Sequence, residues 1–383
     1  MGILFWLGAA ILSMYILLGL DLVIGNRTIR LLRSVSPDLP LKPLRVTIVV
    51  AARNEERNIS DALKSLLNLD YPDLELIVVN DRSADQTGPI LNEMTKDDPR
   101  LRVLHVNELS AGWLGKNHAL WIGSQRASGE LLLFTDADII MQPTTLRRAV
   151  NFLVDSRIDH LAATPSMRMP TIFLEMFGAF FILFFTLFAR PWKARDPKSY
   201  FHIGIGAFNL VRANAYRAVG GHETIRLRPD DDLKLGKIIK KAGFRQDVVL
   251  APEFLSVEWY ATLRDVIHGL EKNAFSGTDY NVGLVLFGVL FLGLSSVWPY
   301  IALFITHGPT FVVYVAVVCL ISLLFAHSAG LHGAKRWYLV GFPFAATLFI
   351  FILLRTMILN LVQGGINWRG TFYSLKELKK NKI

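Results

Sequence analysis

Glu130-Leu-Leu-Leu-Phe-Thr-Asp-Ala-Asp138 is an apolar run that ends in two carboxylates one residue apart. The run is typical of a strand in a parallel sheet, because such strands are covered on both faces. Asp136 and Asp138 would then stand at the carboxyl end of the strand, the edge at which open α/β sheets bind ligands. Neighbouring carboxylates repel each other unless a cation lies between them. Taken alone, the triplet fits a metal site and a solvated turn equally.

The residues before this run predict three more strands with helices between them. Apolar, β-branched runs occupy 46–51, 74–79 and 101–106, and helical patterns occupy 58–67, 88–96 and 118–127. Strands that alternate with helices over short links predict an α/β fold with a doubly wound parallel sheet.

Apolar segments on both sides of this region are long enough to cross a bilayer. The chain has 383 residues and is 52% hydrophobic, and its nearly charge-free stretches are 3–24, 282–305, 310–330 and 338–362. A helix needs about 20 apolar residues to span the hydrocarbon core. We therefore expect an N-terminal transmembrane anchor at 1–25, a basic linker at 26–45, an α/β domain at 46–280, C-terminal transmembrane helices at 281–362 and a basic tail at 363–383.

The distribution of charge predicts the orientation in the cell membrane. The net charge is +9, and five basic residues directly follow the first span: Arg27, Arg30, Arg33, Lys42 and Arg45. Basic residues next to a span favour the cytoplasmic side, so the α/β domain of this multi-pass protein should be cytoplasmic. Nothing in the chain has the pattern of a nucleic-acid-binding module. Cys319 is the only cysteine, which excludes a disulfide within the chain.

Residues 171–191 are expected to form an interfacial helix that lies on the membrane. The apolar part, Met176 to Ala189, would be only about 21 Å long as a helix, shorter than the hydrocarbon core of about 30 Å. A crossing would also put residues 230–232 on the opposite side of the membrane from Asp136 and Asp138. A buried core helix is the alternative.

The C-terminal tail presents a conflict. An anchor followed by three more spans places residues 363–383 outside the cytoplasm, although Arg355 interrupts the last span. The tail is nevertheless basic and carries Arg369, Lys376, Lys379, Lys380 and Lys382. Either the last span does not cross fully, or the tail is an exception to the rule that basic segments stay inside.

A series of short motifs resembles family 2 glycosyltransferases with the GT-A fold. The motifs are Val49-Val-Ala-Ala-Arg-Asn-Glu55, Val78 to Thr87, Gly115-Lys116, Asp136-Ala-Asp138, Gly206 to Arg212 with Val219-Gly-Gly-His222, and Asp230 to Lys237. The resemblance runs from about Val46 to Gly243, and it rests on the order and spacing of the motifs. The spans and the segment Gly365 to Tyr373 are similar to membrane members that act on lipids, the hopanoid-associated, carotenoid and ceramide glycosyltransferase-like groups.

The resemblance implies a nucleotide-sugar site at the carboxyl edge of the sheet. The turn with Ala52, Asn54 and Glu55 lies where it can touch the nucleotide. Asp81 is implied as a ligand of the base, where a carboxylate accepts the N–H of a uracil. Lys116 precedes a helix, a place where a cation can meet a phosphate. The alternatives are a turn residue for Asp81 and a surface lysine for Lys116. Trp113 fits either stacking on a base or sugar or a place in the core.

The same resemblance assigns the acidic residues to a metal and to catalysis. Asp136 and Asp138 would hold Mg²⁺ or Mn²⁺ on the diphosphate, since both ions prefer oxygen ligands. Asp230, Asp231 and Asp232 precede a predicted helix at 233–242, and helix capping accounts for one aspartate rather than three. The family's acidic pair aligns with Asp231 and Asp232. Asp232 is the candidate general base, with Asp230 as the alternative.

One stretch departs from the family pattern. Gly269-Leu-Glu-Lys-Asn273 stands where many processive and lipid-acting relatives carry Gln-x-x-Arg-Trp. Lys272 could supply the arginine's charge at the diphosphate, but the glutamine and tryptophan are absent. His202, His222 and Trp259 are possible lining residues, although a structural role is favoured for each of them.

The sequence therefore predicts a membrane-bound inverting glycosyltransferase that moves a sugar from a nucleotide sugar, a UDP-sugar above all, to a lipid acceptor. The alternatives are a polysaccharide synthase of the same fold and a non-catalytic membrane scaffold. The absence of the Gln-x-x-Arg-Trp motif argues against a polysaccharide synthase. A non-catalytic scaffold is disfavoured because the chain retains the acidic residues Asp81, Asp136, Asp138 and Asp232.

Overall fold

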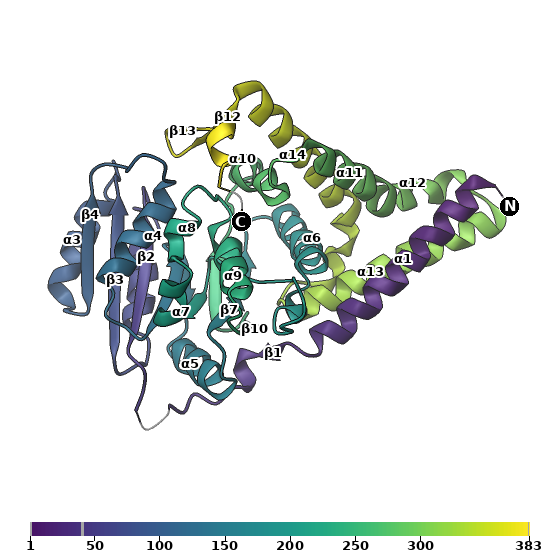
Figure 1. The fold of residues 1–383 in the computed structure, drawn as a ribbon. Helices are drawn as coiled ribbons and strands as arrows, with labels where there is room; N and C mark the ends of the chain where they lie inside the picture. Colours follow the sequence, from purple (N-terminus) through teal and green to yellow (C-terminus); the bar gives the residue numbers. More distant parts are fainter. Residues whose placement is uncertain (1, 40–41, 382) are drawn as a thin grey trace. The chain divides into compact units, whose positions relative to one another are not determined.

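The computed structural model describes residues 2–39, 42–381 and 383, without the side chain of Lys272 (Figure 1). The chain divides into two compact units, each assembled from separate segments. The α/β unit comprises Ile29–Ser166, Pro191–Glu258 and Asn381–Ile383. The helical unit comprises Met1–Thr28, Met167–Arg190 and Trp259–Lys380.

An eight-stranded sheet runs through the α/β unit in the order β1-β10-β7-β9-β5-β2-β3-β4. Its strands are β1 (Arg30–Leu31), β2 (Val46–Ala52), β3 (Leu74–Asp81), β4 (Leu101–Val106), β5 (Leu131–Asp136), β7 (His160–Thr164), β9 (Asn209–Arg212) and β10 (Gln246–Leu250). The strands predicted from the sequence are present and pair in parallel. The sheet is mixed rather than wholly parallel, because β9 is antiparallel to both β5 and β7.

The direction of β9 follows from the path of the chain. The carbonyl of Gly206 accepts a hydrogen bond from the N–H of Asp136 at the end of β5. The chain therefore enters β9 from the carboxyl edge of the sheet. A strand that starts at this edge must run against its neighbours, and this places residues 204–206 beside the end of β5.

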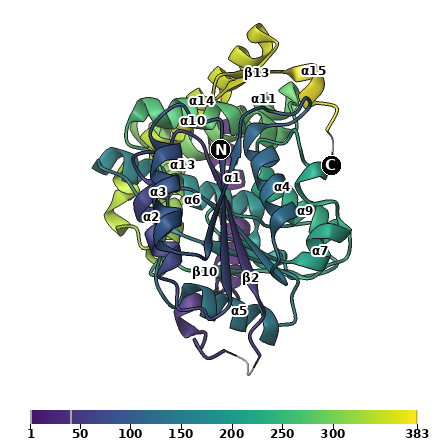
Figure 2. The same ribbon diagram turned by 90° about the vertical axis from the view of Figure 1, so that its left-hand side faces the viewer.

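Helices cover both faces of this sheet. They are α2 (Ile59–Leu67), α3 (Thr87–Asp97), α4 (Gly115–Arg126), α5 (Thr145–Asp155), α7 (Ala213–Ala218), α8 (Gly221–Thr224) and α9 (Asp231–Lys241). Figure 2 shows α2 and α3 on one face and α4, α7 and α9 on the other. Successive side chains of a strand point to opposite faces. Ile48 and Val50 accordingly pack with Leu63 of α2, whereas Val49 packs with Leu120 of α4.

A smaller pairing lies beside the main sheet, where β6 (Ile139–Met141) runs antiparallel to β11 (Leu255–Glu258). The strand β8 (Ser166–Arg168) leads out of the α/β unit. The segment that follows it contains α6 (Ile172–Ala189) and ends before Pro191, where the chain returns to the α/β unit.

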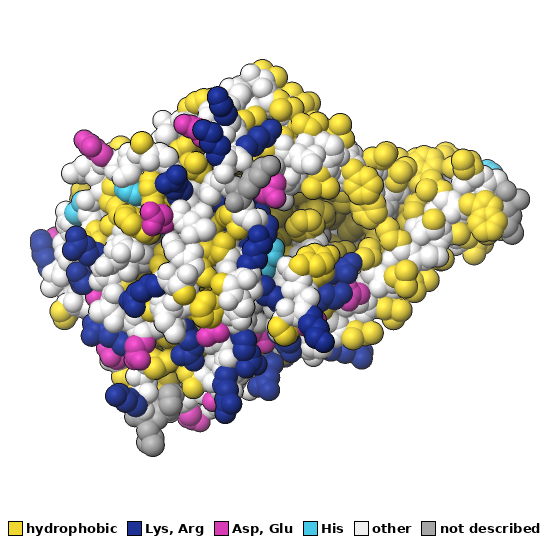
Figure 3. All heavy atoms as spheres, in the orientation of Figure 1, with side chains coloured by type: hydrophobic (Ala, Val, Ile, Leu, Met, Phe, Trp, Pro, Cys, Tyr) yellow, Lys and Arg dark blue, Asp and Glu magenta, His cyan; other side chains and the backbone are white. Residues whose placement is uncertain are grey.

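The helical unit consists mainly of long apolar helices. Its further elements are α1 (Ile3–Asn26), α10 (Leu263–Ala274), α11 (Val282–Leu292), α12 (Trp298–Ile305), α13 (Gly308–Leu331), η5 (Arg336–Gly341), α14 (Phe342–Gln363), the hairpin β12 (Gly365–Trp368) and β13 (Thr371–Ser374), and α15 (Leu375–Leu378). Among the described residues, five helical segments are long and apolar enough to cross a membrane: Ile3–Asn26, Ile172–Lys193, Val282–Ile305, Gly308–Leu331 and Arg336–Gln363. Side chains over α1 and α12 are almost all hydrophobic in Figure 3.

The fold class predicted from the sequence is confirmed: an α/β unit with apolar N-terminal and C-terminal helices. Four of the five apolar segments coincide with the predicted spans, and the fifth overlaps the helix predicted at 171–191. Length and apolarity make the segment Ile172–Lys193 a candidate span as well. The division into an anchor, a linker, a domain and a tail stays a prediction.

Candidate functional site

A pocket lies in the α/β unit at the carboxyl end of β5. It is lined by Lys116, Leu120, Phe134, Thr135, Asp136, Gly206, Asn209, His222, Asp231 and Asp232. These residues come from α4, β5, the loop before β9, β9 itself, α8 and α9, so segments far apart in sequence form one site. Four of the predicted site residues are among them, namely Lys116, Asp136, Asp231 and Asp232.

Lys116 links two of the acidic segments. Its Nζ lies 2.8 Å from Oδ1 of Asp136 and 3.4 Å from Oδ1 of Asp231. Burial alone would lower the pKa of Lys116, but the charges of Asp136, Asp231 and Asp232 outweigh burial and raise it. The ammonium group is therefore held in its charged form.

The position of Lys116 depends on Gly115, which begins α4. A Cβ at Gly115 would lie 2.4 Å from Oδ2 of Asp81, closer than real contacts allow. Only glycine lets the start of α4 approach the end of β3 so closely. Lys116 and Asp81 are thereby held at the same edge of the sheet.

Asp136 and Asp138 have the electrostatics of a cation site. Burial first, and then the charges of Asp136 and Glu55, raise the pKa of Asp138 to about 7. A divalent ion would relieve this repulsion, and carboxylates suit Mg²⁺ and Mn²⁺. The donor set therefore fits a metal held mainly by Asp136 and Asp138. No group of three or more potential metal-binding side chains is preassembled within the described residues.

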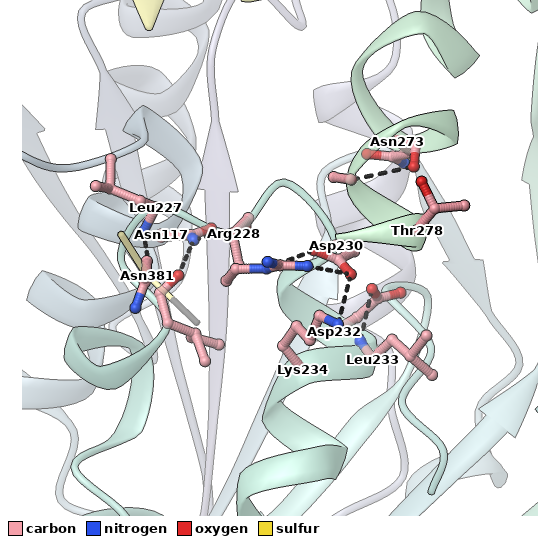
Figure 4. A network of polar contacts seen from close by, with 12 residues as sticks. Asn117, Leu227, Arg228, Asp230, Asp232, Leu233, Lys234, Asn273, Thr278 and Asn381 are labelled. Carbon is pink, nitrogen blue, oxygen red and sulfur yellow. Dashed lines mark hydrogen bonds and ion pairs between the residues drawn. The ribbon is translucent and has the colours of Figure 1, made fainter. Parts of the chain in front are cut away.

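The three consecutive aspartates at the start of α9 have different partners (Figure 4). Asp230 is buried and makes two contacts to the Arg228 guanidinium, at 3.1 Å and 3.2 Å, and one to Lys234 at 3.4 Å. Asp230 holds the N-cap position of α9 without a capping hydrogen bond from its side chain. Its carboxylate is thus committed to a buried ion-pair network.

Asp231 and Asp232 are aimed at the pocket. Asp231 is buried beside Lys116, and burial, with the charges of Asp232 and Asp136, raises its pKa to about 7 against the opposing effect of Lys116. Burial also raises the pKa of Asp232. Asp232 is partly exposed, and its two oxygens accept backbone N–H bonds from Gly206 at 2.8 Å and from Leu233 at 2.7 Å. Its carboxylate is therefore oriented at the pocket.

The turns after β2 and β3 are joined by hydrogen bonds. Ala52 is buried at the end of β2, and the N–H of Asn54 donates to Oγ of Ser83. The N–H of Ala84 donates to Oδ1 of Asn54. The N–H of Glu55 donates to Oγ1 of Thr87, 2.8 Å away. Ala52, Asn54 and Glu55 thus lie at the carboxyl edge, as the sequence predicts.

Both turns contain a strained residue. Asn54 and Arg82 each have a φ of 54°, in the left-handed region that residues other than glycine seldom adopt. Such conformations persist only where surrounding contacts hold them, and they concentrate at binding sites. Arg82 uses this conformation to form two bonds to Asp81, at 2.7 Å and 3.0 Å.

Asp81 is buried between two arginines. Besides Arg82, the guanidinium of Arg53 lies 3.8 Å from its Oδ2. A carboxylate has about four acceptor positions, so such contacts leave capacity for a further donor. Arg53 and Arg82 add positive charge next to the turns that the sequence assigns to a nucleotide. Their signal was available, because each lies in the turn that follows a predicted strand.

The remaining predicted residues lie elsewhere. Lys272 is on α10 in the helical unit, and its side chain lies outside the described residues. Trp259 also belongs to the helical unit, where its ring lies 4.7 Å from that of Phe181. Trp113 is buried and packs on the ring of Trp121 at 5.2 Å. His202 is partly exposed, with burial lowering its pKa.

His222 lines the pocket as a neutral, structural residue. Its Nδ1 lies 2.8 Å from the hydroxyl of Tyr216, and burial, aided by the charge of Lys116, lowers its pKa to about 3. Two further supports were missed in the sequence. Arg228 holds Asp230, and the amide of Asn117 donates to the carbonyls of Ile225 and Arg228, which fixes the loop before α9. The position of Asn117 next to Lys116 was the only hint of its role.

Comparison with known proteins gives three kinds of match. Residues 47–218 match the model of the glycosyl transferase family 2. An uncharacterized glycosyltransferase of Haemophilus influenzae is 34% identical over 121 residues, 32% of this chain and 36% of that protein. A 4,4'-diaponeurosporenoate glycosyltransferase of Staphylococcus aureus is 26% identical over 192 residues, 50% of each chain. The chain thus spans about a third to a half of the length of these relatives.

A solved structure has a similar fold. It is a mannosyltransferase of Pyrobaculum calidifontis in complex with GDP-Man and Mn²⁺. The TM-score is 0.56 at 18% identity, and the superposition covers 93% of this chain and 99% of the other. At this identity the likeness establishes the GT-A fold.

Proposed function

Since residues 47–218 of this chain form a family 2 glycosyltransferase domain of the GT-A fold, we propose that the protein transfers a sugar from a nucleotide sugar to a lipid. One observation carries this proposal. Lys116 lies between Asp136 and Asp231 in a pocket at the carboxyl edge of the sheet. This arrangement offers a fixed cation for a diphosphate beside carboxylates for a metal and for a base.

The donor side of the site would bind the nucleotide and its diphosphate. Asp136 and Asp138 would hold Mg²⁺ or Mn²⁺, which neutralises charge on the departing nucleoside diphosphate. Lys116 binds a phosphate oxygen. Asp81 accepts an N–H from the base, and the N3–H of a uracil meets this requirement, so the proposed donor is a UDP-sugar. The mannosyltransferase of similar fold was solved with GDP-Man and Mn²⁺, which supports a nucleotide sugar and a divalent ion.

The acceptor side would use Asp232 as general base. Asp230 is tied to Arg228, and Asp231 is buried beside Lys116, whereas Asp232 is partly exposed and held by two backbone N–H groups. A hydroxyl oxygen of the acceptor attacks the anomeric carbon and passes its proton to Asp232. The bond from this carbon to the diphosphate breaks, and the electron pair leaves with the diphosphate. A single displacement of this kind inverts the anomeric centre.

Two observations support a lipid acceptor. Five segments among the described residues are apolar enough to cross a membrane, so the domain belongs to a chain with extensive apolar helices. The Staphylococcus aureus relative is a 4,4'-diaponeurosporenoate glycosyltransferase by name, and this name denotes an apolar acceptor with a carboxylate. Arg27, Arg30 and Arg33 after the first span favour a cytoplasmic catalytic domain at the cell membrane.

The test uses the full chain in membranes. Wild-type protein should release UDP from a UDP-sugar in a reaction that chelation of divalent ions stops and Mg²⁺ or Mn²⁺ restores. Asp232→Asn should reduce transfer by about 10²-fold or more while nucleotide binding is retained, because a general base contributes about this much. Asp61→Asn, an exposed residue on α2, is the matched control.

Three outcomes would contradict parts of the proposal. Full transfer by Asp232→Asn would exclude it as the base, and parallel variants of Asp230 and Asp231 would then identify the acid that acts. Mass analysis of the product distinguishes a lipid glycoside from a polymer. A polymer would favour the polysaccharide synthase, and no metal-dependent release from any nucleotide sugar would favour a scaffold.

A further inference from the structure

We propose that the chain crosses the membrane three times, through α1, α11–α12 and α13, and that α6 and α14 bind along the cytoplasmic surface of the bilayer. The inference concerns the helical unit and does not depend on the proposed reaction. It rests on the direction in which the helices run and on the partners of the few charged side chains between them.

The helices α1 and α13 run in the same direction. A Cβ at Gly8 would meet Val313 and Tyr314, and a Cβ at Gly19 would meet Leu324. The contacts therefore advance along both helices together. The small residues let the two backbones approach closely, as is usual inside membranes. Because α1 ends next to Arg27, the C-terminal end of α13 lies at the cytoplasmic end of the bundle.

The segment Val282–Ile305 completes the bundle in the opposite direction. Only Thr306 and His307 separate it from Gly308, the first residue of α13. Within the bundle, the hydroxyl of Tyr15 on α1 lies 3.1 Å from that of Ser296. In Figure 1, α1 and α13 run side by side and α12 meets them near the N-terminus, whereas α14 turns away from α1 and α13. The segment Val282–Ile305 thus joins α1 and α13 at the end of the bundle away from Arg27.

Both ends of α6 contact the cytoplasmic end of this bundle. Glu175, near its start, accepts a hydrogen bond from Tyr338 of η5, which follows α13. Arg190, at its end, lies 3.3 Å from Asp21, near the end of α1. The chain also leaves the α/β unit at Ser166 and returns to it at Pro191. A single crossing would separate these ends, so α6 lies across the end of the bundle.

The ion pair between α14 and α10 indicates that α14 lies at the membrane surface. Arg355, in the second half of α14, pairs with Glu271 of α10 at 2.8 Å. The helix α10 also carries Arg264, Asp265 and His268, and its charges belong at the membrane surface rather than in hydrocarbon. A crossing α14 would carry Arg355 roughly 20 Å into the bilayer from its start at Phe342. The pair with Glu271 holds it at the cytoplasmic surface instead.

The end of the chain gives an independent count of crossings. Asn381 belongs to the α/β unit, where its Oδ1 accepts from the N–H of Leu227 at 3.0 Å and its Nδ2 donates to the carbonyl of Thr224 at 2.9 Å. The chain leaves this unit after Glu258 and returns at Asn381. The number of crossings in between must be even. The segment Val282–Ile305 and α13 supply two, and α14 adds none.

The exposed face of α14 is apolar, as contact with a lipid bilayer requires. Phe344, Phe351, Ile358 and Val362 are exposed and recur at intervals that place them on one face of the helix. The helices α6 and α14 are also more buried than the crossing helices. In α6 and α14, 44% of the most apolar window is buried, against 22–28% in the other three segments. One apolar stripe opposite a well-packed face lets α14 lie against the acyl boundary with its other side covered by protein.

Residues at the start of α14 also suit this placement. Trp337 is 49% exposed and stands next to Lys335 and Arg336. Tryptophan is enriched at membrane interfaces, and basic residues attract the anionic cytoplasmic leaflet. The basic tail would stay in the cytoplasm, so its charges agree with the positive-inside rule. This removes the conflict that four crossings create.

Cysteine labelling tests the topology in the full chain. Cys319 is the only cysteine, so Cys319→Ser gives a background for single exposed cysteines. We expect His307→Cys to react with an impermeant maleimide in right-side-out vesicles. Lys335→Cys and Lys379→Cys should react only in inside-out vesicles. Labelling of Lys379→Cys in right-side-out vesicles, or of His307→Cys only in inside-out vesicles, would overturn the proposal.

A depth measurement tests the orientation of α14 directly. Fluorophores on Phe344→Cys, Phe351→Cys and Ile358→Cys should be quenched equally by lipids brominated at one shallow depth. In a crossing helix these positions would differ by about 21 Å in depth. Val312→Cys and Leu323→Cys on α13 are the controls, and they should differ by about 16 Å. Graded depths along α14 would refute its surface position.

Discussion

Gly206 donates its backbone N–H to Oδ2 of Asp232 over 2.8 Å, and this bond connects the loop before β9 to the acidic start of α9. The same glycine also borders the metal side of the site. A Cβ at Gly206 would lie 2.7 Å from Oδ2 of Asp136. One residue without a side chain thus sets the spacing between the proposed base and the proposed metal ligand.

Gly206→Ala should therefore impair catalysis more than folding. The added methyl group must displace Asp136 or the loop that orients Asp232, and a shift of about 1 Å in a catalytic group can cost about 10²-fold in rate. We expect kcat to fall by about this factor, measured as UDP release. The thermal unfolding temperature should change little, because the loop is at the edge of the core.

Gly277→Ala is the matched control, since a Cβ there meets nothing within 4 Å. It should retain full activity. An active Gly206→Ala protein would show that the site tolerates a shift of Asp136, and would argue against its role as a metal ligand.

Lys116 is the second residue on which the site depends. Lys116→Gln removes the cation that lies between Asp136 and Asp231. We expect kcat/KM for the nucleotide sugar to fall by about 10²-fold or more, because a fixed charge at a diphosphate contributes that much to the transition state. The free energy of unfolding should also fall, by about 1–3 kcal/mol, since Asp231 loses its buried partner.

Lys64→Gln, at an exposed position of α2, controls for the loss of a charge as such. Nucleotide-sugar affinity and thermal unfolding should be measured on the same samples, which separates the effect on the site from the effect on stability. Unchanged kcat/KM in Lys116→Gln would exclude Lys116 from the diphosphate site.

Local patterns explain which parts of this fold were predictable from the sequence. The strands β2, β3 and β5 are runs of apolar residues, and parallel strands bring their carboxyl ends to one edge, so the grouping of Asp81 and Asp136 could be expected. The antiparallel direction of β9 could not be predicted, because it depends on where the chain re-enters the sheet. The roles of Gly206 and Asn381 also depend on segments far apart in sequence, which no local pattern encodes.

Stability should depend on pH through Glu75, a buried residue of β3. Burial alone would raise its pKa, but hydrogen bonds from Ser128, Thr47 and Arg102 outweigh burial and lower the pKa to about 2. The folded pKa is below the unfolded value, taken as 4.5. The ionised carboxylate therefore stabilises the fold fully above this value. Its contribution is lost as the pH falls from there towards about 2.

Glu75→Gln should lower the free energy of unfolding by about 1–3 kcal/mol at pH 7, the range for hydrogen bonds to a charged group. The difference from wild type should shrink below pH 4.5, the upper end of the same window. Denaturant unfolding of the purified chain, followed by tryptophan fluorescence at several pH values, measures this. Glu93→Gln, whose carboxylate pairs with Lys96 in solvent, should have little effect at any pH. A constant difference across the pH range would contradict the assignment.

Asn381 acts at a distance on the loop that carries the acidic cluster. It binds Leu227 and Thr224 at 3.0 Å and 2.9 Å, and this loop continues through Arg228 to Asp230 (Figure 4). From the other side, Asn117 holds the carbonyls of Ile225 and Arg228. Asn381→Ala would leave one of these two supports, so the loop should become more mobile while the pocket keeps all of its side chains.

We expect Asn381→Ala to lower kcat by about 3- to 10-fold with little change in nucleotide-sugar affinity, because the side chains assigned to the donor belong to other segments and Asn117 still holds the loop to α4. Two lost hydrogen bonds correspond to about 1–2 kcal/mol of local stability. Amide hydrogen exchange of residues 224–228 should rise in the variant. Lys379→Ala is exposed and is the control. If exchange rises but kcat is unchanged, the loop does not limit catalysis, and Asn381 only anchors the end of the chain to the α/β unit.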